Sequence, residues 1–160
     1  MPRDPAEQFI ERMGGALTNA GLPRLPSRVF AALCVDEDGR MTAAELGETL
    51  EVSPAAVSGA VKFLAQIHFV HRERERGSRR DVYVVDDDAL HSALLSKDTL
   101  YAPMFVALDD AVDGLEAGSD ARHRLMLMRE FLAFVDTEMT SMATRWEKRR
   151  GQIERELRRS

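Results

Sequence analysis

The chain has 160 residues, and its 22 Lys and Arg against 27 Asp and Glu give a formal net charge of −5 at pH 7. This length holds one core of ordinary size, or a small domain with an appended assembly element. A composition of 44% hydrophobic and 31% charged residues excludes disordered and collagen-like chains. The single cysteine excludes an internal disulfide and fits a reducing compartment. No apolar run reaches the ~20 residues of a membrane span, and MPRDPAEQF lacks the apolar core of a signal peptide, so we expect a cytoplasmic protein without membrane association.

Apolar residues recur at helical intervals near the N-terminus and predict a helix over residues 5–20. They are Phe9, Ile10, Met13 and Leu17. After a loop that contains two prolines, Ser27 is the expected N-cap of a second helix over residues 28–35. Residues 40–41 are then a candidate for a short strand.

Two helices with explicit start signals follow. Thr42 and Glu45 have the spacing of a capping box, which predicts a helix in TAAELGETL. Ser53 and Pro54 fit the N-cap and first position of the next helix, which we expect to end at Gln66. Its inward stripe is apolar, whereas its outward positions are small or basic. These outward residues are Ala55, Ser58, Gly59 and Lys62.

An arginine-rich hairpin comes next. Residues 70–76 and 82–85 read as two strands joined by the turn signal at Gly77 and Ser78. Residues 53–80 carry six basic and two acidic side chains, whereas residues 81–120 carry one basic and ten acidic ones. This asymmetry indicates one surface that faces a polyanion, although a charge block alone is more often only a solvated face.

The C-terminal half is predicted to be helical. Residues 87–115 have helical periodicity, which Pro103 is expected to bend or break. From residue 120 a long helix carries apolar residues in alternating steps of three and four, the spacing of a heptad seam. We interpret this seam as a dimer interface rather than the wall of a ligand pocket, and the apolar face of the first helix is expected to contribute to it. The expected interface residues are Phe9, Met13, Leu17, Leu125, Met128, Leu132, Val135, Met139, Met142 and Trp146.

The order helix, strand, helix, turn, helix, hairpin over residues 27–85 predicts a mainly α winged helix-turn-helix with a small β-hairpin wing. In such a fold the second helix of the motif enters the major groove of DNA, and a small outer face lets it approach the base edges. Ser53, Ser58 and Lys62 supply donors to phosphates or bases. Arginines of the adjacent wing suit the phosphate backbone or a narrow minor groove.

The segment MTAAELGETLEVSPAAVSGAVKFLAQ resembles the winged helix-turn-helix core of MarR-type transcriptional regulators, and GSRRDVYVVDDD resembles the wing of their GbsR-like branch. The resemblance is most specific over about residues 26–88. It implies a homodimer built by N- and C-terminal helices, here residues 1–25 and 89–160. The winged domain over 26–88 would then bind a pseudopalindromic operator in double-stranded DNA. Many members are repressors that a small-molecule ligand releases.

Carried over by position, the recognition helix is Ser53–Gln66, and the resemblance also implies which residues contact DNA. They are Ser53, Ala55, Ser58, Gly59 and Lys62 on the helix and Arg74, Arg76, Arg79 and Arg80 on the wing. Arg72, at the base of the wing, either touches DNA or pairs with an acid such as Asp81. The chain departs from its relatives at His68, where they commonly have glycine after the recognition helix.

Other readings are weaker. We find no nucleophile–base pattern, phosphate loop or paired catalytic acids, so we expect neither an enzyme nor a cofactor. Cys34 is expected to be a small buried hydrophobe in an apolar helix rather than a redox-sensing thiol. His68 and His71, even with Cys34, lack a second ligand pair for a metal site. The remaining rival is a winged helix that binds proteins without sequence-specific DNA, and the small, basic outer face of the recognition helix argues against it.

Overall fold

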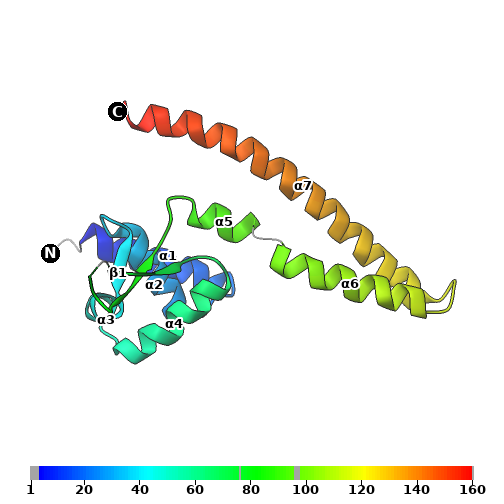
Figure 1. Ribbon diagram of the computed structural model, residues 1–160, viewed down its shortest axis with the longest axis horizontal. Helices are drawn as coiled ribbons and strands as arrows, with labels where there is room; N and C mark the ends of the chain where they lie inside the picture. The colour runs from blue at the N-terminus through cyan, green and yellow to red at the C-terminus, as the bar shows by residue number, and fades with distance from the viewer. Residues whose placement is uncertain (1–3, 76, 96–97, 160) are drawn as a thin grey trace. The chain divides into compact units, whose positions relative to one another are not determined.

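The computed structural model describes residues 4–75, 77–95 and 98–159. The chain divides into two compact units, Met1–Ala93 and Leu94–Ser160, which we describe separately (Figure 1). Helices dominate both units, and the first also contains a small antiparallel sheet, which confirms the predicted mainly α class.

The first unit begins with two helices packed on each other, α1 (Pro5–Asn19) and α2 (Arg24–Val35). Gly14 of α1 is buried, and a Cβ there would lie 3.0 Å from Cγ of Arg28, so the glycine permits the close approach of the two helices. The predicted start of the second helix is wrong. The helix begins at Arg24 because Pro26 fits its first turn, where the missing N–H costs nothing, and Ser27 is buried and donates to the Pro23 carbonyl at 2.8 Å instead of capping.

The two helices of the predicted motif are α3 (Ala43–Leu50) and α4 (Pro54–Gln66). The capping box before α3 is confirmed, because the Thr42 amide donates to Glu45 Oε2 at 2.7 Å and the Glu45 amide donates to Thr42 Oγ1 at 3.2 Å. The bond from the Thr42 amide lowers the pKa of the Glu45 carboxyl below its usual value. The predicted N-cap of α4 is confirmed too, since Ser53 Oγ accepts from the Ala56 amide at 3.2 Å.

Three helix ends in this unit share one backbone motif. After α1, α3 and α4, an amide just past the helix donates to the carbonyl five residues earlier, as Phe69 N does to the Leu64 carbonyl at 2.9 Å. The motif needs a left-handed residue just before that amide. These residues are Gly21, Glu51 and His68, with φ of 106°, 56° and 60°. The resemblance implies glycine at residue 68, and here His68, a residue with a Cβ, takes this costly left-handed conformation instead.

The sheet has three strands, β1 (Arg40–Thr42), β2 (His71–Arg74) and β3 (Asp81–Val84), in the order β1-β3-β2. Tyr83 of β3 pairs with Met41 on one side and with Arg72 on the other. The sequence predicted the hairpin and the short strand separately. The structure joins them, so the wing is anchored to the residues that begin α3.

The core of the first unit lies between α1, α2, α3 and α4 and the segment that leads into β2. Phe30 of α2 and Phe69 meet edge to face with ring centroids 4.7 Å apart. The buried stripe of α4 packs into this core, so its opposite face is presented outward. This stripe is Val57, Ala60, Val61 and Leu64.

The C-terminal half contains α5 (Ala89–Leu95), α6 (Asp98–Gly114) and α7 (Asp120–Leu157). Of the two effects expected of Pro103, a bend or a break, the break is wrong, because α5 ends at Leu95 and Pro103 lies inside α6. Helices α6 and α7 form an antiparallel pair, which is coloured from yellow-green to red in Figure 1. None of the helices in the described residues has the length and apolarity needed to cross a membrane.

Candidate nucleic-acid interface

The outward face of α4 has the composition that the sequence predicted. Its five predicted DNA-contacting residues, which are Ser53, Ala55, Ser58, Gly59 and Lys62, are all exposed. The Ser53 hydroxyl oxygen is used as the helix cap, so its proton remains available to donate outward. The Ser58 hydroxyl donates to the Pro54 carbonyl at 3.1 Å and retains acceptor capacity.

Gly59 has no packing role in the fold. A Cβ built at this position would meet no heavy atom within 4 Å. Glycine inside a helix costs about 1 kcal/mol relative to alanine. Gly59 therefore lowers the stability of the helix slightly, and no contact within the protein explains why glycine is present. A binding partner that approaches the helix closely at this position would explain it.

The wing carries the second part of the interface. Arg74 lies at the end of β2, and Arg79 and Arg80 lie in the turn before β3. All three are exposed, and within the described residues none forms an ion pair. Their charge is thus available to an external anion. Arg76, the fourth predicted contact, lies outside the described residues.

Arg72 behaves differently from the other wing arginines. Its Nη1 lies 3.3 Å from Asp81 Oδ2 on the neighbouring strand, and 66% of its side chain is exposed. This confirms the pairing with Asp81, the second of the two roles left open by the sequence. The pair joins the two strands of the wing at its base.

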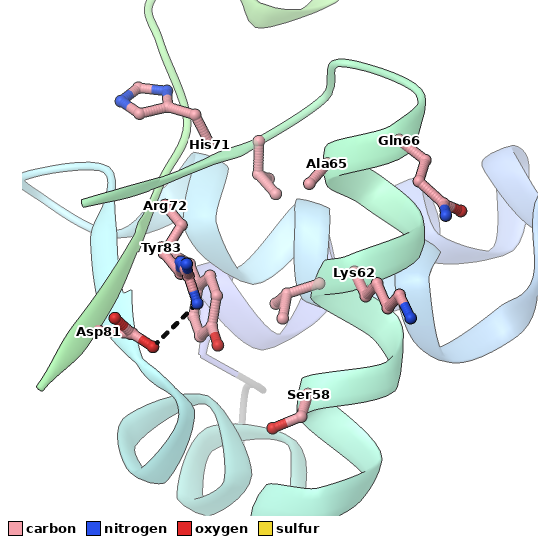
Figure 2. Close-up of a pocket in the computed structure, with 10 residues that line it drawn as sticks. Ser58, Lys62, Ala65, Gln66, His71, Arg72, Asp81 and Tyr83 are labelled. Atoms are coloured by element: carbon pink, nitrogen blue, oxygen red, sulfur yellow. Dashed lines mark hydrogen bonds and ion pairs between the residues drawn. The ribbon is translucent and has the colours of Figure 1, made fainter. Parts of the chain in front are cut away.

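A groove of about 640 Å³ separates the recognition helix from the wing. Figure 2 shows Ser58, Lys62 and Gln66 extending from α4, with Arg72, Asp81 and Tyr83 on the strands beside it. Sequence reasoning missed Gln66 and Tyr83 as lining residues. Helical spacing could have found Gln66, four residues after Lys62. Tyr83 could not be placed before the sheet register and its packing beside α4 were known.

A chain of polar side-chain contacts runs across the sheet from β1 to β2. Arg40 Nη2 lies 2.9 Å from Glu73 Oε2, and His71 Nε2 lies 3.1 Å from Glu73 Oε1. His71 Nδ1 lies 3.3 Å from Asp86 Oδ2, so each ring nitrogen faces a carboxylate. The bond to His71, more than the charge of Arg40, lowers the pKa of Glu73. This network ties β1 and β2 together and steadies the wing.

Cys34 departs from its prediction. The residue is exposed rather than buried, because it lies at the last turn of α2, where the helix leaves the core. Partial desolvation of the sulfur by its neighbours nevertheless raises the pKa of the thiol to about 11. The thiol is therefore protonated at neutral pH, which is the opposite of a reactive thiolate.

The predicted dimer residues occupy different environments. Phe9, Met13 and Leu17 are partly buried against the core of their own unit. On α7, Leu132 is buried, and Met139 Sδ accepts a hydrogen bond from the Tyr101 hydroxyl at 3.5 Å. Met128, Met142 and Trp146 are exposed by 37–47%. The dimer interface as a whole stays a prediction.

The first unit has the features of a winged helix-turn-helix protein. The second of its two capped helices presents small, exposed residues to the outside, and beside it lies a three-stranded sheet whose hairpin carries arginines. Residues 28–82 match a model of the MarR family, and residues 88–149 match a model of MmpR5-like MarR family transcriptional regulators. The two matched segments together span most of the chain, and both models describe MarR family proteins, so the chain is similar to MarR family winged-helix transcriptional regulators.

Individual relatives extend over most of the chain. HTH-type transcriptional regulator MmpR5 of Mycobacterium tuberculosis (strain ATCC 25618 / H37Rv) is 29% identical over 150 residues, which cover 91% of this chain and 88% of that protein. YvaV of Bacillus subtilis (strain 168), a candidate HTH-type transcriptional regulator, is 26% identical over 137 residues, or 86% of this chain and 70% of that one. A crystal structure of a transcriptional regulator matches with a TM-score of 0.80 and 25% identity over 91% of this chain and 99% of that chain.

Proposed function

We propose that the protein is a ligand-responsive repressor that binds a pseudopalindromic operator as a homodimer. The observation that carries the DNA-binding part is the exposed, small face of α4 beside exposed wing arginines that form no ion pair with a described acid. The matches to MarR family models support the regulatory role and the dimer. The finer placement in the GbsR-like branch rests on the wing sequence alone.

Each half of the interface has a distinct task in this proposal. Ala55 and Gly59 let α4 come close to the base edges, while Ser53 and Lys62 donate to bases and phosphates. The Ser58 hydroxyl, whose proton goes to the Pro54 carbonyl, accepts from a base edge. Arg74, Arg79 and Arg80 neutralise backbone phosphates or enter the minor groove. Two copies related by a two-fold axis would read half-sites about 34–36 Å apart, one helical turn of DNA.

The acidic remainder of the chain orients the approach. Residues 1–52 and 81–120 are both strongly acidic, with 9 and 10 carboxylates. A polyanion is repelled by these segments and attracted by the face that joins α4 and the wing. The overall charge of −5 is therefore compatible with DNA binding.

The ligand response is supported by the family alone. An effector releases DNA only if it binds the DNA-free geometry of the dimer more tightly than the bound one. In the proposed mechanism it shifts the two recognition helices away from the spacing of the half-sites.

Selection of bound DNA from a random pool tests the proposal directly. The expected product is an inverted repeat whose half-sites are about one helical turn apart. A pool with no enriched sequence, although the protein binds DNA at low salt, would refute the sequence-specific part. The absence of any binding would favour the rival, a protein-interaction module.

The variant Gly59→Ala tests whether Gly59 serves DNA binding rather than folding. We expect this variant to be more stable by about 0.5–1 kcal/mol, since alanine favours the helix, and to bind the selected DNA at least several-fold more weakly. Gly15→Ala is the matched control, because Gly15 is also an exposed helical glycine with open space at its Cβ. It should gain similar stability with unchanged DNA affinity. Equal DNA affinity of both variants would contradict the close approach at Gly59.

A further inference from the structure

The first residue of β2 is a histidine that faces away from the recognition helix. His71 borders the groove, but Figure 2 shows its imidazole directed away from α4. Neighbouring residues of a strand point to opposite faces, so Glu73 shares this face with His71. Arg72 lines the groove, and Arg74, two residues further along β2, lies on the same face as Arg72. A change in the contacts of His71 therefore acts on the strand that carries Arg74.

Each nitrogen of the His71 ring lies near a carboxylate. Nε2 is 3.1 Å from Glu73 Oε1, and Nδ1 is 3.3 Å from Asp86 Oδ2, in the segment between β3 and α5. A neutral imidazole has one N–H, and its other nitrogen presents a lone pair, whereas an ionised carboxylate offers lone pairs alone. With a neutral ring, one carboxylate therefore faces a lone pair. The arrangement is complementary at both nitrogens when the ring is doubly protonated.

Asp86 links the ring to an acidic part of the surface. It lines a cavity of about 430 Å³ beside the last turn of α2, together with further acids. These acids are Asp36, Glu37, Asp38 and Asp87. Like charges repel one another, so Asp86 is held more firmly beside an imidazolium than beside a neutral ring. Protonation of His71 therefore fastens the segment after β3 to the start of β2.

The imidazole is the part of this network that changes charge near neutral pH. The hydrogen bond with His71, its largest cause, lowers the pKa of the Glu73 carboxyl, which is therefore ionised over the range in which histidine titrates. Arginine, lysine, aspartate and tyrosine side chains ordinarily keep their charge state between pH 6 and 8. The groups of this kind on the strands and on α4 are Arg40, Lys62, Arg72, Asp81 and Tyr83.

We propose that His71 is a pH-sensitive anchor of the wing, whose protonation fastens β2 and thereby strengthens DNA binding. With a protonated ring, both carboxylates are bound at once, and β2 is fixed to the segment after β3. As the pH rises and the ring loses its proton, one of the two contacts is lost. The strand is then less constrained, and holding Arg74 against a phosphate costs more conformational entropy. The inference rests on the proposed DNA binding and adds the proton as a regulator of it.

The pH dependence of DNA affinity tests this role. At constant ionic strength, fluorescence anisotropy with the selected inverted-repeat DNA should show binding about two- to fivefold weaker at pH 8 than at pH 6, the effect of an exposed ion pair. His71→Gln, which takes no charge, should bind with the weaker affinity at both pH values. His71→Arg, which is always charged, should bind with the stronger affinity at both.

His68→Gln is the matched control, because His68 is an exposed histidine three residues before His71. This variant should keep the pH dependence of the parent. A pH dependence that persists in both His71 variants would overturn the proposal, and so would its loss in His68→Gln.

Two measurements on the DNA-free protein test the anchor independently. NMR spectra of the His71 ring nitrogens should change from two N–H groups to one between pH 5 and 8. In urea denaturation at fixed protomer concentration, the midpoint of the parent should exceed that of His71→Gln at pH 6 and approach it at pH 8. The contribution is present while the ring is protonated and is lost as the pH rises. A difference in midpoint that does not vary with pH would refute the anchor.

Failure of this inference and failure of the proposed function are distinguishable. If the protein selects no DNA sequence, the proposed function fails, while the ring spectra and the urea midpoints still decide whether His71 anchors the wing. If the inverted repeat is selected but the His71 variants follow the parent at every pH, the proposed function stands and the anchor is refuted.

Discussion

His68 gives the sharpest test of how the recognition helix is joined to the wing. Its left-handed backbone, with φ of 60°, lies in a helix-ending motif in which the His68 amide bonds to the Ala65 carbonyl at 3.2 Å. A residue with a Cβ costs roughly 1–2 kcal/mol in this conformation. Glycine removes that cost but adds about 0.5–1 kcal/mol of conformational entropy to the unfolded chain. His68→Gly should therefore stabilise the protein by about 0.5–1 kcal/mol.

Chemical denaturation at fixed protomer concentration measures this change, because the stability of a dimer depends on concentration. His68→Ala is the matched control. It removes the exposed imidazole but keeps the Cβ, so its free energy of unfolding should stay within about 0.5 kcal/mol of the parent. Gly21→Ala provides the reverse change. Gly21 has the same role after α1 and open space at its Cβ, so a loss of about 1 kcal/mol or more there comes from the backbone alone.

Two results would refute this reasoning. A His68→Gly variant no more stable than His68→Ala would show that the backbone at residue 68 is not strained. A His68→Gly variant less stable than the parent would show that the imidazole has a structural role in the turn. The stabilised variant is also expected to keep its DNA affinity, because the motif and its hydrogen bonds are unchanged.

Three further predictions concern the wing, a helix cap and the thiol. Arg79→Ala should weaken binding to all DNA sequences and lower the slope of log affinity against log salt by about two per dimer; an unchanged slope in gel shifts excludes a phosphate contact at this residue. The lowered pKa of Glu45 makes its carboxylate stabilising above pH 4.5, and this contribution is lost as the pH falls through the folded-state pKa. The free energy of unfolding of Glu45→Gln, which lacks this charge, should therefore lie below that of the parent at pH 7 by less than about 1 kcal/mol, and the gap should close as the pH falls below 4.5; a constant gap contradicts the assignment. The Cys34 thiol, with a pKa of about 11, should react with iodoacetamide far more slowly than free cysteine at pH 7.5 and accelerate up to pH 10; fast labelling at pH 7.5 contradicts the protonated state.

Local signals were enough to predict the order of elements in the first unit. The capping box of Thr42 and the cap at Ser53 act over three residues, so the sequence displays them directly. The alternation of buried and exposed residues in α4 is a local property in the same way. For this reason the winged helix-turn-helix and the outward residues of the recognition helix were predictable.

The start of α2 shows where local signals fail. The sequence around Ser27 is compatible with two structures. The prolines could lie in a loop with Ser27 as the N-cap of the helix, or the same residues could form the first turn of the helix. The packing of α2 on α1 and the core decides between the two, and it buries Ser27. Cys34 was predicted to be buried and is exposed. Its apolar sequence neighbours do not reveal that the last turn of the helix extends beyond the core.

The sequence by itself determined the elements of this protein and the chemistry of its exposed helix, because caps and periodicity depend on neighbours three or four residues away. The tertiary structure alone decided how those elements meet. It paired β1 with the wing, placed Tyr83 in the groove beside α4, and turned Leu132 of α7 towards α6 while leaving Phe131 exposed. A heptad pattern shows that an apolar face exists, but the face that remains for a partner depends on which side the chain has already covered with its own helix.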